Sequence, residues 1–335
     1  MRRTIYHRGW FVGLLSVGML ALVDDGRSQN PADAQAEQLL QVARKAYNEG
    51  NASFAADRFR EYLQKFGGHK EAVAARYGLG LALLDLPEPD YAKALEALQA
   101  AAQDNNFPHR GHALYYAGIA RRGMGQKELL PGLRNPAELA QRQQAALPHF
   151  TEAARLFAQA AEVLGKSQPP APDWVARARC DQAEMELLLG RPQEARKAVE
   201  PLVTGGDTKA AWRPLALYYH GAACFLLGET AQAARSLDAL APFEQPFGLH
   251  ARYLRGRIHL IDGELAEAHV AFQAVLSGYD KRKAEALELL KQPDRFRTQP
   301  WEKAHWQALA QLPPPDYVPG AAFYDACILY ETGKF

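Results

Sequence analysis

The sequence has little of what marks catalytic, nucleic-acid-binding and disulfide-stabilised proteins. Its 335 residues include three cysteines, Cys180, Cys224 and Cys327, which lie far apart in apolar stretches. This set predicts neither a disulfide framework nor a metal site, and we expect the three thiols to pack in the interior. Lys and Arg total 39 against 38 Asp and Glu, so no overall charge favours nucleic acid or a membrane surface.

Catalytic motifs are also missing. The glycines end helical stretches rather than follow strands, so no phosphate-binding loop is expected. Neither a serine nucleophile elbow nor a paired-carboxylate motif occurs. His109 and His112 have the i, i+3 spacing of a metal pair, but no Asp, Glu or Cys accompanies them at a metal-site spacing. The sequence therefore predicts no catalytic residue, no metal and no cofactor, and we do not expect an enzyme.

Signals for strands and for nucleic-acid binding are equally scarce. Long alternations of Val, Ile and Thr are absent, whereas Ala and Leu dominate, which favours helix throughout. The basic cluster at 281–283 is short and stands alone, as on a solvated helix face. The sequence thus predicts an all-α protein with no nucleic-acid partner.

One apolar run, at 10–23, is 14 residues long. This length is short for a membrane span but suits the core of a signal peptide. Arg2, Arg3 and Arg8 precede the run, and the small residues of 32–34 offer a cleavage site. We expect residues 1–34 to be an export signal, which would place the protein in the periplasm or cell envelope. An uncleaved anchor formed by 10–23 is the alternative, and membrane contact is expected at most through this segment.

What the sequence does contain is a recurring pattern of small and aromatic residues. It reads ARYGLG at 75–80, ALYYAG at 113–118, ALYYHG at 216–221 and ARYLRG at 251–256, with weaker copies at 178–183 and 321–326. Gly118 follows Gly80 by 38 residues, and Gly256 follows Gly221 by 35. Periods of this size indicate an array of helical repeats, and such arrays usually bind other proteins.

Each repeat is predicted to form two helices separated by a turn. In the clearest copy, the small residue Gly256 lies in the first helix, Gly263 makes the turn, and Ala268 and Phe272 lie on one face of the second helix, which Gly278 is expected to end. The small residue should let the two helices approach closely. Equivalent turn glycines are Gly50, Gly125, Gly190 and Gly228, and equivalent second-helix pairs are Ala55 with Phe59, Ala195 with Val199, and Ala233 with Leu237.

This pattern resembles the tetratricopeptide repeat family, and the resemblance covers about 35–335. It implies an αα-superhelix, a solenoid of about six to seven helix-turn-helix repeats that acts as a protein-interaction scaffold. The early units are most similar to exported envelope members of the outer-membrane assembly or Tol-associated type. Residues 66–68 (FGG) stand where those proteins usually have Tyr-Pro.

The resemblance also implies a concave groove, lined by the first helices, that would hold a peptide or helix of a partner protein. A groove with aromatic rings and a few arginines would suit a partner with some acidic character. The same tyrosine spacing suits rings that pack between repeats, and both interpretations stay open. The Lys/Asn clamp with which some family members hold a terminal carboxylate is not matched. The predicted groove residues are Arg44, Tyr47, Tyr77, Tyr115, Arg122, Tyr218, Phe225, Tyr253 and Arg257.

The ends of the chain leave alternatives for its function. The pattern at 320–335 predicts a first helix without its second, so the chain is expected to continue or to be covered by another protein. A rival hypothesis is therefore the regulatory N-terminal region of a larger enzyme, and a third is a cytoplasmic assembly factor with a membrane anchor. The predicted divisions are 1–34 (signal peptide or anchor), 35–165 (units one to three, with an insertion at 126–144), 166–172 (proline-rich connector), 173–279 (units four to six), 280–319 (irregular helical segment) and 320–335 (truncated unit).

Overall fold

The computed structural model describes residues 31–205, 207–292, 296 and 300–334, and this part of the chain is helical without strands. The predicted export signal lies almost wholly outside the described residues. None of the described helices is both long and apolar enough to span a membrane. The helices are α1 (Pro31–Asn48), α2 (Ala52–Phe66), α3 (Ala72–Leu84), α4 (Tyr91–Ala102), α5 (Arg110–Arg134), the short 3-10 helix η2 (Pro136–Glu138), α6 (Leu139–Gly165), α7 (Pro172–Leu188), α8 (Pro192–Thr204), α9 (Arg213–Leu226), α10 (Thr230–Asp238), α11 (Gly248–Ile261), α12 (Leu265–Leu290), α13 (Pro300–Gln311) and α14 (Tyr317–Glu331).

Four of the turns between paired helices are set by glycine. Gly50, Gly190, Gly228 and Gly263 have φ between 69° and 80°, a left-handed conformation that glycine adopts without a steric penalty. Each lies just beyond the end of a first helix, as predicted. The second helix then starts at once; in α2, for example, the Asn51 side chain accepts a hydrogen bond from the N–H of Phe54.

Paired helices approach closely at the predicted small residues. A Cβ atom at Gly256 would lie 2.8 Å from Cε1 of Phe272, and one at Gly221 would lie 2.8 Å from Cγ of Leu237. Ala268 and Phe272 are fully buried. The prediction that these glycines admit the second helix is confirmed, because any larger residue there would overlap the core.

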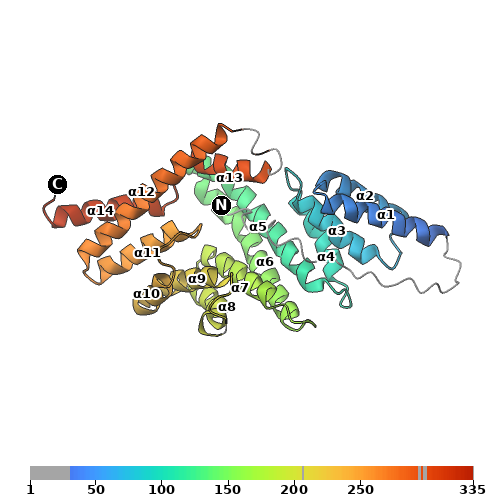
Figure 1. Cartoon of the computed structure of the whole chain (residues 1–335), viewed down its shortest axis with the longest axis horizontal. Helices are drawn as coiled ribbons and strands as arrows, with labels where there is room; N and C mark the ends of the chain where they lie inside the picture. Colours follow the sequence, from blue (N-terminus) through green and yellow to red (C-terminus); the bar gives the residue numbers. More distant parts are fainter. Residues whose placement is uncertain (1–30, 206, 293–295, 297–299, 335) are drawn as a thin grey trace.

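The array comprises six described helix pairs, from α1–α2 to α11–α12, followed by α13 and α14. Every helix of the pairs packs on the next one along the chain, and α14 packs on α12. The molecule is elongated, with α1–α4 at one end and α14 at the other (Figure 1). One buried cluster extends from Ala36 to Met185, a second from Cys180 to Ile258, and smaller ones join α12 to α14. The fold is therefore the predicted all-α solenoid.

Two predicted helix ends are wrong. Gly125 lies inside α5, and Gly278 lies inside α12. In both cases the missing side chain makes room for a neighbour: a Cβ at Gly125 would lie 2.6 Å from Cε1 of Phe150, and one at Gly278 2.6 Å from Cδ2 of Leu249. These glycines allow close packing without φ above zero. The helices therefore continue, and much of 126–144 extends α5 and α6.

Candidate partner-binding surface

Polar side chains of α1 reach the neighbouring first helix, α3. Arg44 Nη2 lies 3.0 Å from Oε2 of Glu71, and the Tyr47 hydroxyl donates to Oδ2 of Asp85 at 2.9 Å. Glu71 and Asp85 flank the two ends of α3. Burial, together with the nearby Asp85 carboxylate, raises the pKa of Tyr47 well above its usual value. The hydroxyl therefore stays protonated and keeps its bond to Asp85.

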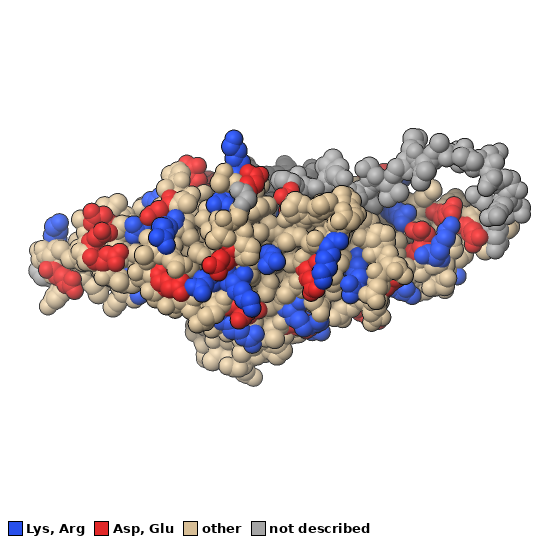
Figure 2. All heavy atoms as spheres, turned by 90° about the horizontal axis from the view of Figure 1, so that it is seen from below, with Lys and Arg blue, Asp and Glu red and all other residues tan. Residues whose placement is uncertain are grey.

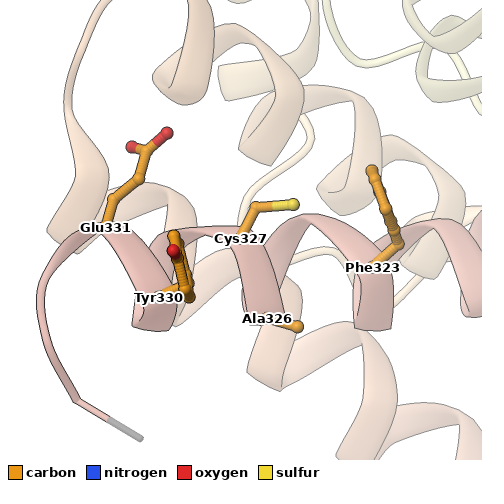
Figure 3. Close-up of a pocket in the computed structure, with 5 residues that line it drawn as sticks. All are labelled: Phe323, Ala326, Cys327, Tyr330 and Glu331. Atoms are coloured by element: carbon orange, nitrogen blue, oxygen red, sulfur yellow. The ribbon is translucent and has the colours of Figure 1, made fainter.

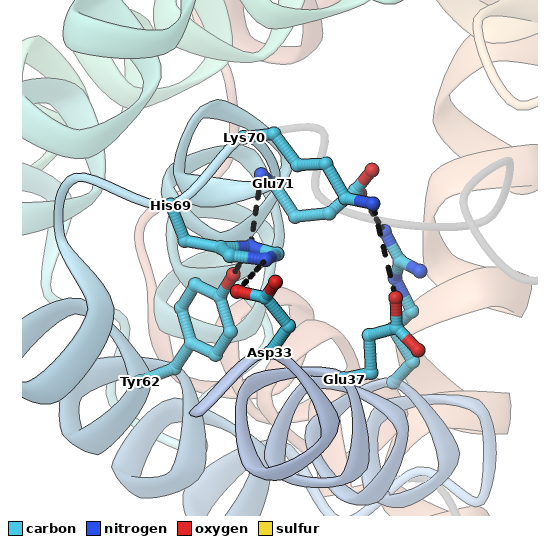
Figure 4. A network of polar contacts seen from close by, with 7 residues as sticks. Asp33, Glu37, Tyr62, His69, Lys70 and Glu71 are labelled. Carbon is cyan, nitrogen blue, oxygen red and sulfur yellow. Dashed lines mark hydrogen bonds and ion pairs between the residues drawn. The ribbon is translucent and has the colours of Figure 1, made fainter. Parts of the chain in front are cut away.

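The same end of the array carries a polar network around His69 (Figure 4). The N–H of Glu71 donates to His69 Nδ1 at 3.3 Å, and the Tyr62 hydroxyl lies 2.7 Å from the same nitrogen. Because Nδ1 accepts, the neutral ring carries its hydrogen on Nε2, which faces Asp33 Oδ1 at 3.8 Å. These contacts fix the loop between α2 and α3 against the start of α1.

Aromatic rings fill the space between the next three first helices, α3, α5 and α7. Tyr77 stacks on His109, with ring centroids 5.8 Å apart, and also contacts Tyr116. His112 meets the edge of Trp174 at 4.7 Å, and both of its ring nitrogens are buried without a hydrogen-bond partner. Burial, helped by His109, lowers the pKa of His112 to about 4. The histidine pair of the sequence is thus part of an aromatic cluster.

An ion-pair network links α5 to α7. Arg122 Nη1 lies 3.0 Å from Oδ1 of Asp181 and 3.0 Å from Oε2 of Glu184, and the Tyr115 hydroxyl donates to Oδ2 of Asp181 at 2.6 Å. The side chains of Arg122, Asp181 and Glu184 are 12%, 14% and 20% exposed. Burial opposes the charge on Arg122, but the two carboxylates outweigh it and raise its pKa.

Arg257 occupies the equivalent region of the C-terminal units. Its guanidinium lies 5.6 Å from the ring centroid of Phe225 on α9 and 4.2 Å from that of Tyr324 on α14. Nη1 also donates to the hydroxyl of Tyr253 at 3.2 Å. Within the described residues, no carboxylate forms an ion pair with Arg257. The two rings and the hydroxyl hold an arginine whose charge has no direct counter-ion there.

We call the nine predicted groove residues the first-helix face. The structure brings them together in groups that join each first helix to its neighbours, as the contacts above show. Tyr115 and Tyr218 are buried and pack between units; the Tyr218 hydroxyl lies 2.6 Å from His250 Nδ1. The other seven, which are partly accessible to solvent, are Arg44, Tyr47, Tyr77, Arg122, Phe225, Tyr253 and Arg257. Their contact with a partner stays a prediction.

Three further residues of this surface are not among the predicted ones. Trp174 lies outside the six-residue pattern and packs on His112. Asp181 takes, in the weak copy at 178–183, the place that Tyr116 and Tyr219 take in stronger copies. A charged residue at a position that is aromatic in the other copies could have indicated an ion pair between helices. Tyr324 was visible in the weak copy at 321–326, but its contact with Arg257 depends on the fold.

A shallow hollow of about 320 Å³ lies on α14 at the far end of the array. It is lined by Phe323, Ala326, Cys327, Tyr330 and Glu331, which project from successive turns of the helix (Figure 3). Phe323 is 64% exposed and Tyr330 is 73% exposed. This is an apolar helix face rather than an enclosed pocket.

A cysteine–histidine pair on α9 faces α10 but is closed to substrate. Cys224 Sγ lies 3.7 Å from His220 Nδ1, which is 2.8 Å from Ser236 Oγ. All three side chains are buried. Burial raises the pKa of the Cys224 thiol to about 11, so the thiolate needed for nucleophilic attack is disfavoured.

Charged side chains of both signs occur together on the described surface. Figure 2 shows basic and acidic side chains interspersed over most of the face that it draws. Among the described residues, no group of three or more His, Cys, Asp or Glu side chains is placed to hold a metal ion.

Comparisons with known proteins find only distant similarity. No protein-family model matches the sequence, and no curated protein matches it. Among solved structures, a tetratricopeptide repeat protein from Parabacteroides merdae is 18% identical over 73% of this chain and 93% of its own, with a TM-score of 0.36. NprR in complex with its cognate peptide NprX is 16% identical over 90% of this chain and 80% of its own, with a TM-score of 0.36. The apo form of RapI is 8% identical over 90% of this chain and 99% of its own, with a TM-score of 0.41.

Proposed function

We propose that this chain is an exported scaffold of the tetratricopeptide repeat type, which binds other proteins in the bacterial cell envelope. A stacked array of helix pairs offers a long surface and no enclosed catalytic centre among its described residues, which suits recognition of a partner. In this proposal the partner lies as an extended peptide or a helix along the first-helix face.

The main support for this proposal is the environment of Arg257. This arginine is held between the rings of Phe225 and Tyr324 and bonded to Tyr253, so little side-chain entropy would be lost on binding. Its charge has no carboxylate partner in the described part of the chain. A half-buried arginine framed by aromatic rings suits an acidic side chain that is followed or preceded by an apolar one.

A random peptide library displayed on phage and selected on the whole chain would test this function. We expect acidic peptides to be enriched, and Arg257→Gln to weaken their binding by about tenfold, as for loss of one charge-assisted hydrogen bond. Arg142→Gln is the matched control, because Arg142 lies on α6 and pairs with Glu138. Enriched peptides that bind Arg257→Gln as tightly as the unaltered chain would refute the surface that we propose.

Export needs its own experiment. Residues 1–34 fused to alkaline phosphatase, an enzyme active only outside the reducing cytoplasm, should give active enzyme. Leu15→Asp, in the middle of the apolar run, should abolish that activity. An inactive fusion would overturn export. An active fusion that stays in the membrane fraction uncleaved would support the anchor formed by 10–23 instead.

A further inference from the structure

A second hollow, of about 440 Å³, lies between α10, α11 and α12. Arg252, Arg255 and His259 of α11 line it. These residues lie on the side of α11 away from Tyr253 and Arg257, so the hollow is separate from the first-helix face. Asp238 and Phe243 line it from the α10 side, and Ala266, Glu267, Val270 and Ala271 line it from α12.

The equivalent place in the preceding unit is closed. The repeat interval of 35 residues puts His220 of α9 in the place of Arg255, and Ser236 of α10 in the place of Ala271. His220 is buried, with Nδ1 2.8 Å from Ser236 Oγ. In the later unit alanine replaces that hydroxyl, so Arg255 meets no acceptor from the second helix at this place.

Arg255 is accordingly left with an unpaired donor. Its Nε donates to Oδ1 of Asp238 at 2.6 Å, whereas Nη1 is buried without a hydrogen-bond partner. The side chain is 19% exposed. A buried guanidinium N–H that lacks an acceptor is costly, and an oxygen supplied by a bound group would satisfy it.

Arg252 adds a second guanidinium, which is held in place by a strained loop. Its Nη2 donates to the carbonyl of Pro242 at 2.9 Å, and its charge lies 5.1 Å from the Phe243 ring centroid. No carboxylate of the described residues forms an ion pair with it. Phe243 has a φ of 67°, which is rare for an aromatic residue, and a Cβ at Gly248 would overlap the Phe243 carbonyl. Such strain is found at ligand clamps.

We propose that this hollow binds the carboxylate of an acidic side chain in a partner polypeptide, through Arg252 and Arg255. Two arginine forks match the planar geometry of a carboxylate. Asp238 and Glu267 in the walls repel a doubly charged phosphate more strongly than a singly charged carboxylate. Val270, which is 67% exposed, and Ala266 offer an apolar surface for a residue beside the acidic one. This site adds a contact on a different side of the array from the proposed groove.

Fluorescence anisotropy of the whole chain with labelled tripeptides tests this site. The probes are a leucine–glutamate–leucine peptide and its leucine–glutamine–leucine counterpart, each with the dye on its N-terminal amine and an amide at its C-terminus. We expect the glutamate peptide to bind at least about tenfold more tightly, as for a charge-assisted hydrogen bond. Equal binding of the two peptides, displacement by inorganic phosphate at the peptide's own concentration, or tighter binding of free glutarate than of the peptide would each overturn the proposal.

Three variants assign the binding to the hollow. Arg255→Gln should lose the glutamate preference, whereas Arg155→Gln, whose side chain pairs with Glu152 on α6, should keep it. Ala271→Ser introduces the hydroxyl that the preceding unit has at this place, which gives Nη1 of Arg255 an internal acceptor. It should therefore lower the affinity for the glutamate peptide at least about threefold and raise the melting temperature. Undiminished binding in Arg255→Gln would refute the site. Circular dichroism confirms that each variant is folded. All of these proteins are compared in the Arg257→Gln background, which removes binding of the acidic peptide at the first-helix face and keeps the two sites distinguishable.

Discussion

Arg122 faces two carboxylates of the next first helix, and the three side chains are mostly buried. At the scale of single residues, this network joins the third and fourth units by charge in addition to apolar packing. Charged groups inside a protein depend on one another, because loss of one partner leaves the other charges buried and uncompensated.

We therefore expect Arg122→Gln to lower the free energy of unfolding by about 2–4 kcal/mol, because Asp181 and Glu184 would then repel each other in a buried place. Urea unfolding measures this change. Arg142 also faces two carboxylates, Glu128 and Glu138, but its side chain is 37% exposed, so Arg142→Gln should cost less than about 1 kcal/mol. Equal losses in the two variants would contradict the role given to burial.

His112 makes stability depend on acidity. Its folded-state pKa of about 4 lies below the ordinary histidine value of 6.5, so the fold favours the neutral ring. The stabilisation is full above pH 6.5 and is lost as the pH falls from 6.5 towards 4, since the unfolded chain takes up the proton first. Because neither ring nitrogen has a partner, His112→Leu should remove roughly 2–3 kcal/mol of this pH dependence and keep stability at pH 7. If the free energy of unfolding falls by the same amount between pH 7 and pH 4 in both proteins, His112 does not cause the pH dependence.

At the scale of helices, glycine explains both the success and the failure of the sequence interpretation. Ala268 and Phe272 follow the helical period, so their burial could be predicted. Gly263 ends a helix, whereas Gly125 and Gly278 allow two helices to touch. One residue type serves both purposes, and only the neighbouring helix decides between them. The lengths of α5 and α12 could therefore not be predicted from the sequence pattern.

The exposed face of α14 has a consequence for solubility. Phe323 and Tyr330 make an apolar stripe beside Ala326 (Figure 3). Large exposed apolar patches promote association. The double variant Phe323→Ser with Tyr330→Ser should reduce light scattering at high protein concentration and shift the unfolding midpoint little, since neither ring is in the core. Scattering as strong as in the unaltered chain would show that this face does not drive association.

At the scale of the whole molecule, the array is extended and each unit contacts mainly its neighbours (Figure 1). Helical periodicity could predict this architecture, because each unit repeats the same local pattern. The joining contacts could not be predicted in the same way. Arg122 and Asp181 are 59 residues apart, and which charged or aromatic groups meet across units depends on the turn and length of every intervening helix.

Local damage should therefore stay local. Phe59 is buried against α3. Phe59→Ala should lower the free energy of local unfolding of the helices around it by about 3–5 kcal/mol. Hydrogen exchange followed by mass spectrometry should become faster in α1–α4 and stay unchanged in α11–α14. Equal acceleration over the whole chain would instead show a single cooperative unit.

Site-specific photo-crosslinking in the native cell tests the central claim, that partners bind the first-helix face. A photoreactive benzoyl-phenylalanine placed at Tyr47 or at Phe225 should form a covalent adduct with a partner protein. The same residue at Phe54 on α2 or at Leu287 on α12, both exposed on second helices, should form none. Adducts only at Phe54 and Leu287 would contradict the claim and place recognition on the second helices.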